Sequence, residues 1–184
     1  DRSYGIFAQS AVDTAYVEAG LLNANMTNAE FVAALGQIPL KHQPGSRWEY
    51  SVSVDVQGYL VEVLSGMSFG EFLDERIFKP LEMTDTDFHV PEEKINRFAQ
   101  MYVYGSEGQL IPSEMFDSAD FTVDKAFESG GGGLVSTASD YMRFSQMLLN
   151  GGELDGVRIL APLTVELMHR DQTPAGMTGP MSGA

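Results

Sequence analysis

Residues 43–55 read Gln-Pro-Gly-Ser-Arg-Trp-Glu-Tyr-Ser-Val-Ser-Val-Asp, a stretch that joins turn residues and two aromatic side chains to the start of a helix. Pro44 and Gly45 predict a turn, because proline presets a turn φ angle and glycine tolerates a positive one. The spacing of Trp48 and Tyr50 then resembles the alternation of a short strand. An amphipathic helix follows, so Tyr50 is expected to project from a loop held rigid by that helix, which suits a reactive group. Spacing alone favours the competing interpretation, a core tyrosine whose hydroxyl is hydrogen-bonded.

The helix that follows is predicted over Ser53–Ser65. Apolar side chains recur there three and four residues apart, a spacing that places them on one face and predicts that this face is buried. Gly66 comes next and predicts the C-terminus of the helix, since glycine tolerates the left-handed conformation that ends many helices. The stripe consists of Val56, Tyr59, Leu60, Val63 and Leu64.

Four further helices are indicated by their terminal residues. A Ser or Thr with an acid three residues later satisfies the free amides of a first turn, and proline is also favoured there. The fold class is α+β and rich in helix, because the strand signals are few and short. The predicted helices follow Thr27 (to about Leu35), Ser68 (to Pro80) and Thr137 (to Gly151), and the last runs from Pro162 to about Arg170. The predicted strands are Gln100–Tyr104, its hairpin mate Gln109–Ile111, and short pieces near Leu134 and Ile159.

The composition argues against several functional classes. The 184 residues carry 26 acidic and 11 basic side chains, a formal net charge of −15. Such a surface repels nucleic-acid backbones and anionic membranes, so neither is expected as a partner. Cysteine is absent, which excludes disulfides, thiol catalysis and Cys-bound zinc. The histidines lack the His-x-x-x-His spacing of zinc hydrolases, so no metal and no cofactor is expected. They are His42, His89 and His169.

Two glycine-containing motifs receive structural explanations. Gly66–Gly70 matches the G-x-S-x-G of a nucleophile elbow, but that elbow follows a strand, whereas a helix is predicted here. Ser68 is therefore expected to be an N-cap. Gly130–Gly133 lacks the lysine of a phosphate-binding loop, so either a close approach of two backbones or a sharp entry into a strand at Leu134–Ser136 is expected instead. Carboxylate pairs in predicted loops are expected to be solvated surface: Glu92 with Glu93, and Asp85 with Asp87.

Several motifs together resemble those of the serine β-lactamase-like and penicillin-binding superfamily. The likeness is closest to esterases related to class C β-lactamases, the family VIII carboxylesterases. It covers nearly the whole chain, and the motifs come in the family's order. They are Pro44-Gly-x-x-Trp-x-Tyr-Ser-x-Ser53, Val61-Glu-Val-Leu-Ser-Gly66, Arg76-Ile-Phe-Lys-Pro-Leu-Glu-Met-Thr-Asp-Thr86, Gly131-Gly-Gly-Leu-Val-Ser-Thr-Ala-Ser-Asp-Tyr-Met-Arg-Phe144 and Met147-Leu-Leu-Asn-Gly-Gly152.

The resemblance implies a serine hydrolase that acts on carboxylic esters through an acyl-enzyme. Tyr50 would be the general base and acid that moves the proton of the nucleophile, which reverses the argument from spacing. Ser51 and Val52 would bind the substrate. Val52 stands where β-lactamases usually place an asparagine that binds a substrate amide. Because valine offers no hydrogen bond, short-acyl esters are expected to be preferred over β-lactams.

The nucleophile that the resemblance implies, a serine in Ser-x-x-Lys, does not occur in residues 1–184. The third motif of the family, Lys-Thr-Gly or a relative of it, is also missing. We therefore expect residues 1–184 to be an internal fragment of the serine β-lactamase/DD-peptidase fold. This fragment would be mainly the helical lobe with a flexible tail at about 172–184, and it would be inactive alone.

Three alternatives stay open at this point. The protein could be a β-lactamase or DD-peptidase, a penicillin-binding-like sensor or scaffold without turnover, or a self-sufficient helical interaction module. The last would expose apolar patches and form oligomers or aggregates. The expected partner is a small-molecule ester, and the sequence leaves open both a homo-oligomer and the compartment, bacterial cytoplasm or periplasm.

Overall fold

The computed structural model describes residues 10–21, 25–113, 121–174 and 177. They form a helix-rich arrangement with two short antiparallel hairpins, which confirms the predicted fold class. The predicted tail at 172–184 lies largely outside the described residues. In the described part of the chain, no helix is long and apolar enough to cross a membrane. The elements are α1 (Ala11–Glu18), α2 (Asn28–Leu35), α3 (Ser53–Ser65), α4 (Phe69–Leu73), the π-helical turn η1 (Asp74–Phe78), the 3-10 helix η2 (Glu92–Arg97), β1 (Tyr102–Tyr104), β2 (Leu110–Pro112), α5 (Ala138–Leu149), β3 (Glu153–Leu154), β4 (Val157–Arg158) and α6 (Pro162–Met168).

Helix termini form where the sequence places them. The Thr27 hydroxyl accepts a hydrogen bond from the Glu30 N–H (3.2 Å), and the Glu30 carboxylate accepts one from the Thr27 N–H (2.9 Å). Ser68 and Glu71 form the same capping box at the start of α4. Gly66 ends α3 with a φ of 73°, in the left-handed region. These local patterns confirm the predicted starts of α2 and α4 and the predicted end of α3.

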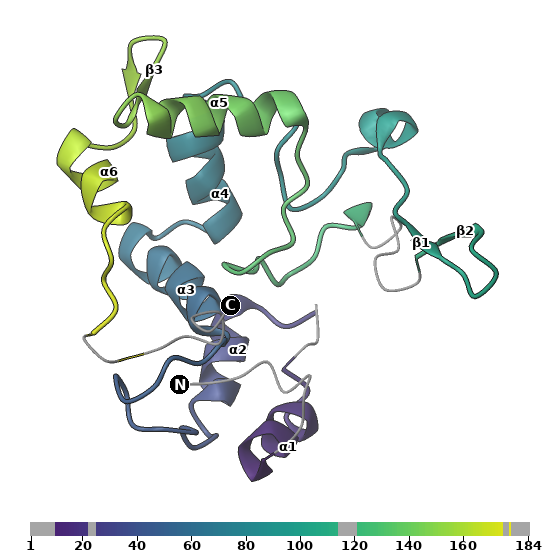
Figure 1. The fold of residues 1–184 in the computed structure, drawn as a ribbon, viewed down its shortest axis with the longest axis vertical. Coiled ribbons are helices and arrows are strands. Elements are labelled where there is room, and N and C mark those ends of the chain that lie inside the picture. Colours follow the sequence, from purple (N-terminus) through teal and green to yellow (C-terminus); the bar gives the residue numbers. More distant parts are fainter. Residues whose placement is uncertain (1–9, 22–24, 114–120, 175–176, 178–184) are drawn as a thin grey trace.

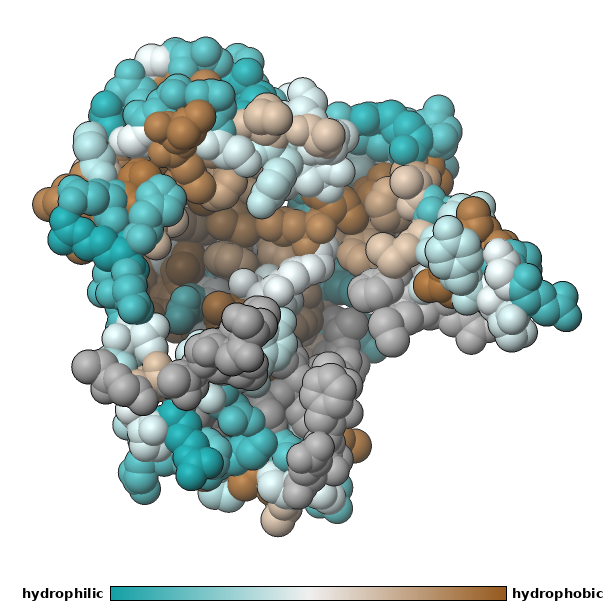
Figure 2. Space-filling model, in the orientation of Figure 1, coloured by the Kyte–Doolittle hydropathy of each residue, from teal (hydrophilic) through white to brown (hydrophobic). Residues whose placement is uncertain are grey.

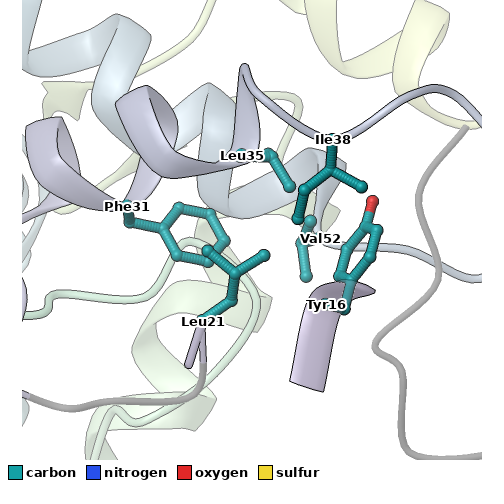
Figure 3. Packing of buried hydrophobic residues seen from close by; sticks show 6 residues of the cluster. All are labelled: Tyr16, Leu21, Phe31, Leu35, Ile38 and Val52. Atoms are coloured by element: carbon teal, nitrogen blue, oxygen red, sulfur yellow. The ribbon is translucent and has the colours of Figure 1, made fainter. Parts of the chain in front are cut away.

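The first hydrophobic cluster joins α1, α2 and the start of α3 (Figure 3). Helix α1 was not predicted; it begins with a capping box in which Ser10 and Asp13 bond each other's backbone N–H groups. Its Tyr16 ring packs into the cluster. Because α3 begins one residue after Val52, the cluster holds the N-terminus of α3 against α1 and α2. Its buried members are Tyr16, Leu21, Phe31, Leu35, Ile38 and Val52.

A second cluster joins the α4–η1 segment to α5 and the β3–β4 hairpin. Helix α4 passes directly into η1, whose wider turn brings Phe78 into the interior. Leu81 and, from α5, Met147 have no exposed surface. Figure 1 shows α5 crossing the end of the α4 segment, with the β3–β4 hairpin at its far end. The buried members are Phe78, Leu81, Met83 and Met147.

The prediction for the buried face of α3 is wrong. Leu60 is 52% exposed, Val63 60% and Leu64 78%, whereas Asp55 and Gly58 are buried. Gly58 lets α3 approach Phe69 of α4 and the Gly130 backbone closely. Of the predicted stripe, Val56 is half-buried and packs against the first cluster, whereas its C-terminal part lies on the surface. Figure 2 shows apolar surface in the hollowed middle of the face of the molecule that is in view, below α5.

The predicted hairpin is confirmed as β1 and β2, with Val103 opposite Ile111. All six strand residues are exposed, and the hairpin projects from the body (Figure 1). The strand piece near Leu134 forms a single antiparallel bridge between Val135 and Asp87. The piece near Ile159 is represented by β4, which pairs with β3.

Candidate active site

Tyr50 lies on the loop between α2 and α3, and its side chain is 67% exposed. The alternative interpretation, a tyrosine buried in the core, is therefore wrong. The ring stacks beside Trp48 with a centroid separation of 6.4 Å and an interplanar angle of 29°. Tyr50 consequently presents most of its ring to the surface while its loop is held by its neighbours.

The residue before Tyr50 is fixed by ion pairs. Lys41 Nζ lies 2.7 Å from Glu49 Oε1 and 3.5 Å from the carboxylate of the buried Asp13 in α1. His42 Nε2 lies 3.7 Å from the other carboxylate oxygen of Glu49. The hydrogen bond to Glu49 raises the pKa of Lys41 above its usual value, so Lys41 stays charged at neutral pH. The Tyr50 loop is thus tied to α1 on its N-terminal side.

The residues after Tyr50 point in different directions. The Val52 side chain is 3% exposed and belongs to the first hydrophobic cluster (Figure 3). A substrate therefore cannot contact this side chain without displacing the core. The Ser51 hydroxyl lies 2.8 Å from that of Ser53 and accepts a hydrogen bond from the Ser53 N–H (3.3 Å). Val52 anchors the turn, while Ser51 stays near the surface beside Tyr50.

The first turn of α3 contacts the glycine loop across 74 residues of sequence. The buried Asp55 carboxylate accepts hydrogen bonds from the Ser129 hydroxyl and from the Gly131 N–H (3.3 Å). A Cβ built on Gly130 would lie 2.0 Å from the Val54 carbonyl oxygen. The expected close approach of two backbones at Gly130–Gly133 is confirmed at Gly130.

Two carboxylates meet at the N-terminus of α4. Glu62 accepts a hydrogen bond from the Phe69 N–H (3.2 Å), and Glu128 accepts one from the Gly70 N–H (2.7 Å). The buried Asn28 amide donates to the Glu62 carboxylate (2.9 Å) and to the Glu128 carbonyl (3.0 Å). Burial raises the pKa of the Glu128 carboxyl, and the charge of Glu62 adds to this effect.

The nucleophile-elbow interpretation stays rejected. Ser68 follows α3 and Gly66 rather than a strand, and its hydroxyl accepts a hydrogen bond from the Glu71 N–H (3.1 Å). This is the N-cap geometry that the sequence predicts.

A groove of about 710 Å³ lies beside η1 and η2, away from the residues that flank Tyr50. Arg97 and Lys94 both bind the Asp85 carboxylate and lower its pKa to about 2. The Asp140 carboxylate of α5 accepts hydrogen bonds from the Asp85 N–H (2.7 Å) and the Thr86 hydroxyl (2.9 Å). Asp85 is therefore an ion-paired group and not the free solvated carboxylate that the sequence predicts.

Metal-binding geometry is not found in the described ranges: no group of three or more His, Asp or Glu side chains there could hold a metal ion. The polar clusters around Tyr50 and α4 consist of hydrogen bonds and ion pairs instead.

The profile of the Beta-lactamase family matches residues 5–183, nearly the whole chain. The chain belongs to the Beta-lactamase family. An uncharacterized protein of Mycobacterium tuberculosis (strain CDC 1551 / Oshkosh) is 41% identical over 142 residues, which cover 77% of this chain and 35% of that protein. Esterase EstB of Burkholderia gladioli is 32% identical over 131 residues, 62% of this chain and 32% of EstB. The solved structure of simvastatin synthase (LovD) from Aspergillus terreus matches 96% of this chain and 42% of that one, with a TM-score of 0.73 and 27% identity.

This Beta-lactamase family chain spans about a third of the length of the curated relatives it matches. Esterases and acyltransferases occur among those relatives. The sequence analysis assigned Tyr50 to catalysis and Ser51 and Val52 to substrate binding; in the structure Tyr50 is exposed, Ser51 is half-buried and Val52 is buried. The pairing of Asp55 with Ser129 carried no local signal, since it joins residues 74 positions apart.

Proposed function

We propose that this chain is part of a serine hydrolase that cleaves carboxylic esters through an acyl-enzyme, with Tyr50 as general base and acid. The observation that carries the proposal is the 67% exposure of the Tyr50 side chain on an anchored loop. The Glu49 ion pairs hold the loop on one side and the buried Val52 holds it on the other. A catalytic phenol needs this combination, because it must reach a substrate and still keep its geometry.

The proposed chemistry requires a positive charge near the phenol. A free phenol has a pKa near 10, so only about one in a thousand is ionised at pH 7. A neighbouring ammonium can lower a phenol pKa by roughly 1–3 units, which brings it into the range for general-base catalysis. In the proposed enzyme this ammonium comes from the lysine of a Ser-x-x-Lys motif. That motif does not occur in residues 1–184, so other residues of the protein would supply it, and residues 1–184 alone would be inactive.

In the proposed reaction, Tyr50 takes the proton of the nucleophilic serine hydroxyl as the serine oxygen attacks the ester carbonyl. It then returns the proton to the oxygen of the departing alcohol. Water then attacks the acyl-enzyme. Tyr50 takes a proton from this water and gives it to the serine oxygen, and the carboxylic acid is released. Tyr50 is thus unchanged after one turnover, as a general acid–base catalyst must be.

Substrate preference is proposed from the two residues that follow Tyr50. Ser51 lies near the surface, and we assign it to the substrate-binding side of the turn. Val52 has no hydrogen-bonding side chain and is buried, so it offers nothing to the amide of a β-lactam substrate. Because this position offers no hydrogen bond to an amide, we propose that carboxylic esters are preferred over β-lactams.

The direct test is Tyr50→Phe in the full-length protein, assayed with p-nitrophenyl butyrate. Loss of the hydroxyl is expected to lower kcat by about 10²–10⁴-fold. The matched control is Tyr141→Phe, because the Tyr141 side chain on α5 is 66% exposed and so comparably accessible. Near-normal turnover of Tyr50→Phe would mean that Tyr50 only packs against its neighbours.

Two further measurements separate the alternative functions. A higher kcat/KM on nitrocefin than on p-nitrophenyl butyrate would identify a β-lactamase and reject the ester preference. Intact mass after incubation with a fluorophosphonate is expected to show one covalent adduct on the full-length protein and none on residues 1–184. An unreactive full-length protein would instead indicate a binding protein without turnover.

A further inference from the structure

The first turn of α3, which begins just after Tyr50, lacks the usual side-chain cap. Val52 occupies the N-cap position and makes no capping hydrogen bond through its side chain. The Ser51 hydroxyl accepts a hydrogen bond from the Ser53 N–H, but this bond is long, at 3.3 Å. Because this side-chain cap is only one long hydrogen bond, the first turn needs further support from outside the helix.

Asp55 supplies that support from the third residue of the helix. Asp55 is 4% exposed, and its carboxylate accepts hydrogen bonds from the Ser129 hydroxyl and the Gly131 N–H. The Gly131 N–H also lies 3.0 Å from the Ser129 oxygen, so the three groups form a closed cluster. A buried charge is costly unless it is hydrogen-bonded, and a carboxylate is favoured at a helix N-terminus. We call these three residues the α3 clasp.

The backbone contact beside the clasp leaves no room for adjustment. The Cβ that a side chain would add at Gly130 would lie 2.0 Å from the Val54 carbonyl oxygen and 2.8 Å from its carbon. A Cβ on Gly58, one turn further along α3, would lie 3.5 Å from the Gly130 Cα. The loop and the first turn of α3 are therefore packed backbone against backbone.

We propose that Asp55 and Ser129, through the α3 clasp, are positioning residues for Tyr50; this rests on the proposed function. The Tyr50 ring stacks beside Trp48 on this loop and is otherwise largely exposed. Its position follows from the backbone of the turn that Val52 and the first turn of α3 hold. Loosening the clasp would let that turn rotate and would displace the phenol from the reacting atoms.

The prediction concerns catalysis more than binding. A displacement on the order of 1 Å can cost about 100-fold in rate when reacting groups must align, while ground-state binding changes less. We therefore expect Ser129→Ala to lower kcat by about 10- to 100-fold with little change in KM. Ser129→Thr keeps the hydroxyl and is expected to restore most of kcat.

The glycine loop offers a matched pair of variants. Gly130→Ala drives the loop away from Val54 and is expected to lower kcat as Ser129→Ala does. Gly132→Ala makes the same chemical change two residues away, where a Cβ would meet nothing within 4 Å, and is expected to keep the wild-type kcat. All variants are measured in the full-length protein with p-nitrophenyl butyrate. Each kcat is normalised to folded enzyme by the final stoichiometry of fluorophosphonate labelling.

The outcomes separate this inference from the proposed function. If Tyr50→Phe is inactive and Ser129→Ala loses kcat but Ser129→Thr does not, the positioning role is supported. If Tyr50→Phe is inactive while Ser129→Ala keeps its normalised kcat and only melts at lower temperature, the clasp serves stability and the inference is overturned. If Tyr50→Phe keeps normal turnover, the proposed function fails, and with it the role of the clasp in positioning a catalyst.

Discussion

Replacing Val52 by asparagine tests the placement of this residue most sharply. In β-lactamases with the resembling motif an asparagine at this position binds the substrate, so Val52→Asn invites the expectation of improved amide recognition. The structure argues for the opposite result. The Val52 side chain is 3% exposed among apolar neighbours that include Tyr16, Leu35 and Ile38. An amide placed there finds no solvent and loses the packing of the valine methyl groups.

The magnitude follows from two contributions. Full burial of a valine side chain is worth about 1.5–3 kcal/mol, most of which a polar replacement gives up. A buried amide without hydrogen-bond partners costs about 1–3 kcal/mol more. We therefore expect Val52→Asn to lower the free energy of unfolding by about 3–5 kcal/mol, a large part of the stability of an ordinary domain.

The assay is urea unfolding of the full-length protein, followed by circular dichroism at 222 nm. The expected result is a lower midpoint with an unchanged slope, since the surface exposed on unfolding stays the same. Val52→Ala is the control, because it removes methyl groups without adding an amide. If Val52→Asn is no less stable than Val52→Ala, or gains nitrocefin turnover at wild-type stability, the side chain faces a cleft and our placement of it is wrong.

Three further predictions use groups outside the Tyr50 loop. Ser68→Ala should cost about 1 kcal/mol of stability through the lost α4 cap and leave turnover unchanged; an inactive but folded variant would restore the nucleophile-elbow interpretation. Glu128→Gln should raise Tm at neutral pH, because burial raises the pKa of the Glu128 carboxyl and the folded state therefore favours its protonated form. This difference in Tm between the variant and the wild type should shrink as the pH falls to about 4.5 and below. A Tm difference that stays constant from neutral to acid pH would contradict the raised pKa of Glu128. Asp85→Asn should lower Tm at neutral pH, because Arg97 and Lys94 hold the pKa of Asp85 at about 2, below its usual value of 3.8. The stabilisation is present above 3.8 and lost as the pH falls through about 2; a Tm difference that stays constant over this range would count against the ion pairs.

Features set by neighbouring residues could be predicted from the sequence. The capping boxes at Thr27 and Ser68 and the β1–β2 hairpin depend on side chains and turns within a few residues, and the structure has them. Periodicity could locate α3 but not the face that it buries. That face is chosen by Asp55 and Gly58, which allow close backbone contact that a larger apolar side chain would prevent.

In the candidate site, too, features set by nearby residues could be predicted, and features set by distant residues could not. Tyr50 could be singled out because its motif is local, whereas Val52 was assigned to the substrate and lies in the core. Its inward direction depends on α1, a helix that the sequence analysis did not predict. Asp140 shows the limit clearly: its backbone N–H meets the Thr137 cap as predicted, but its carboxylate bonds Asp85 and Thr86, more than fifty residues earlier.

The unequal space around two glycines of one loop, Gly130 and Gly132, matters for anyone who wishes to diversify this protein. At position 132 the surroundings are open, so a combinatorial library can introduce many side chains without disturbing the scaffold. At position 130 even the smallest addition collides with main-chain atoms of α3, which cannot swing aside as a flexible side chain can. Engineering of this loop should therefore randomise residue 132 and leave residue 130 untouched.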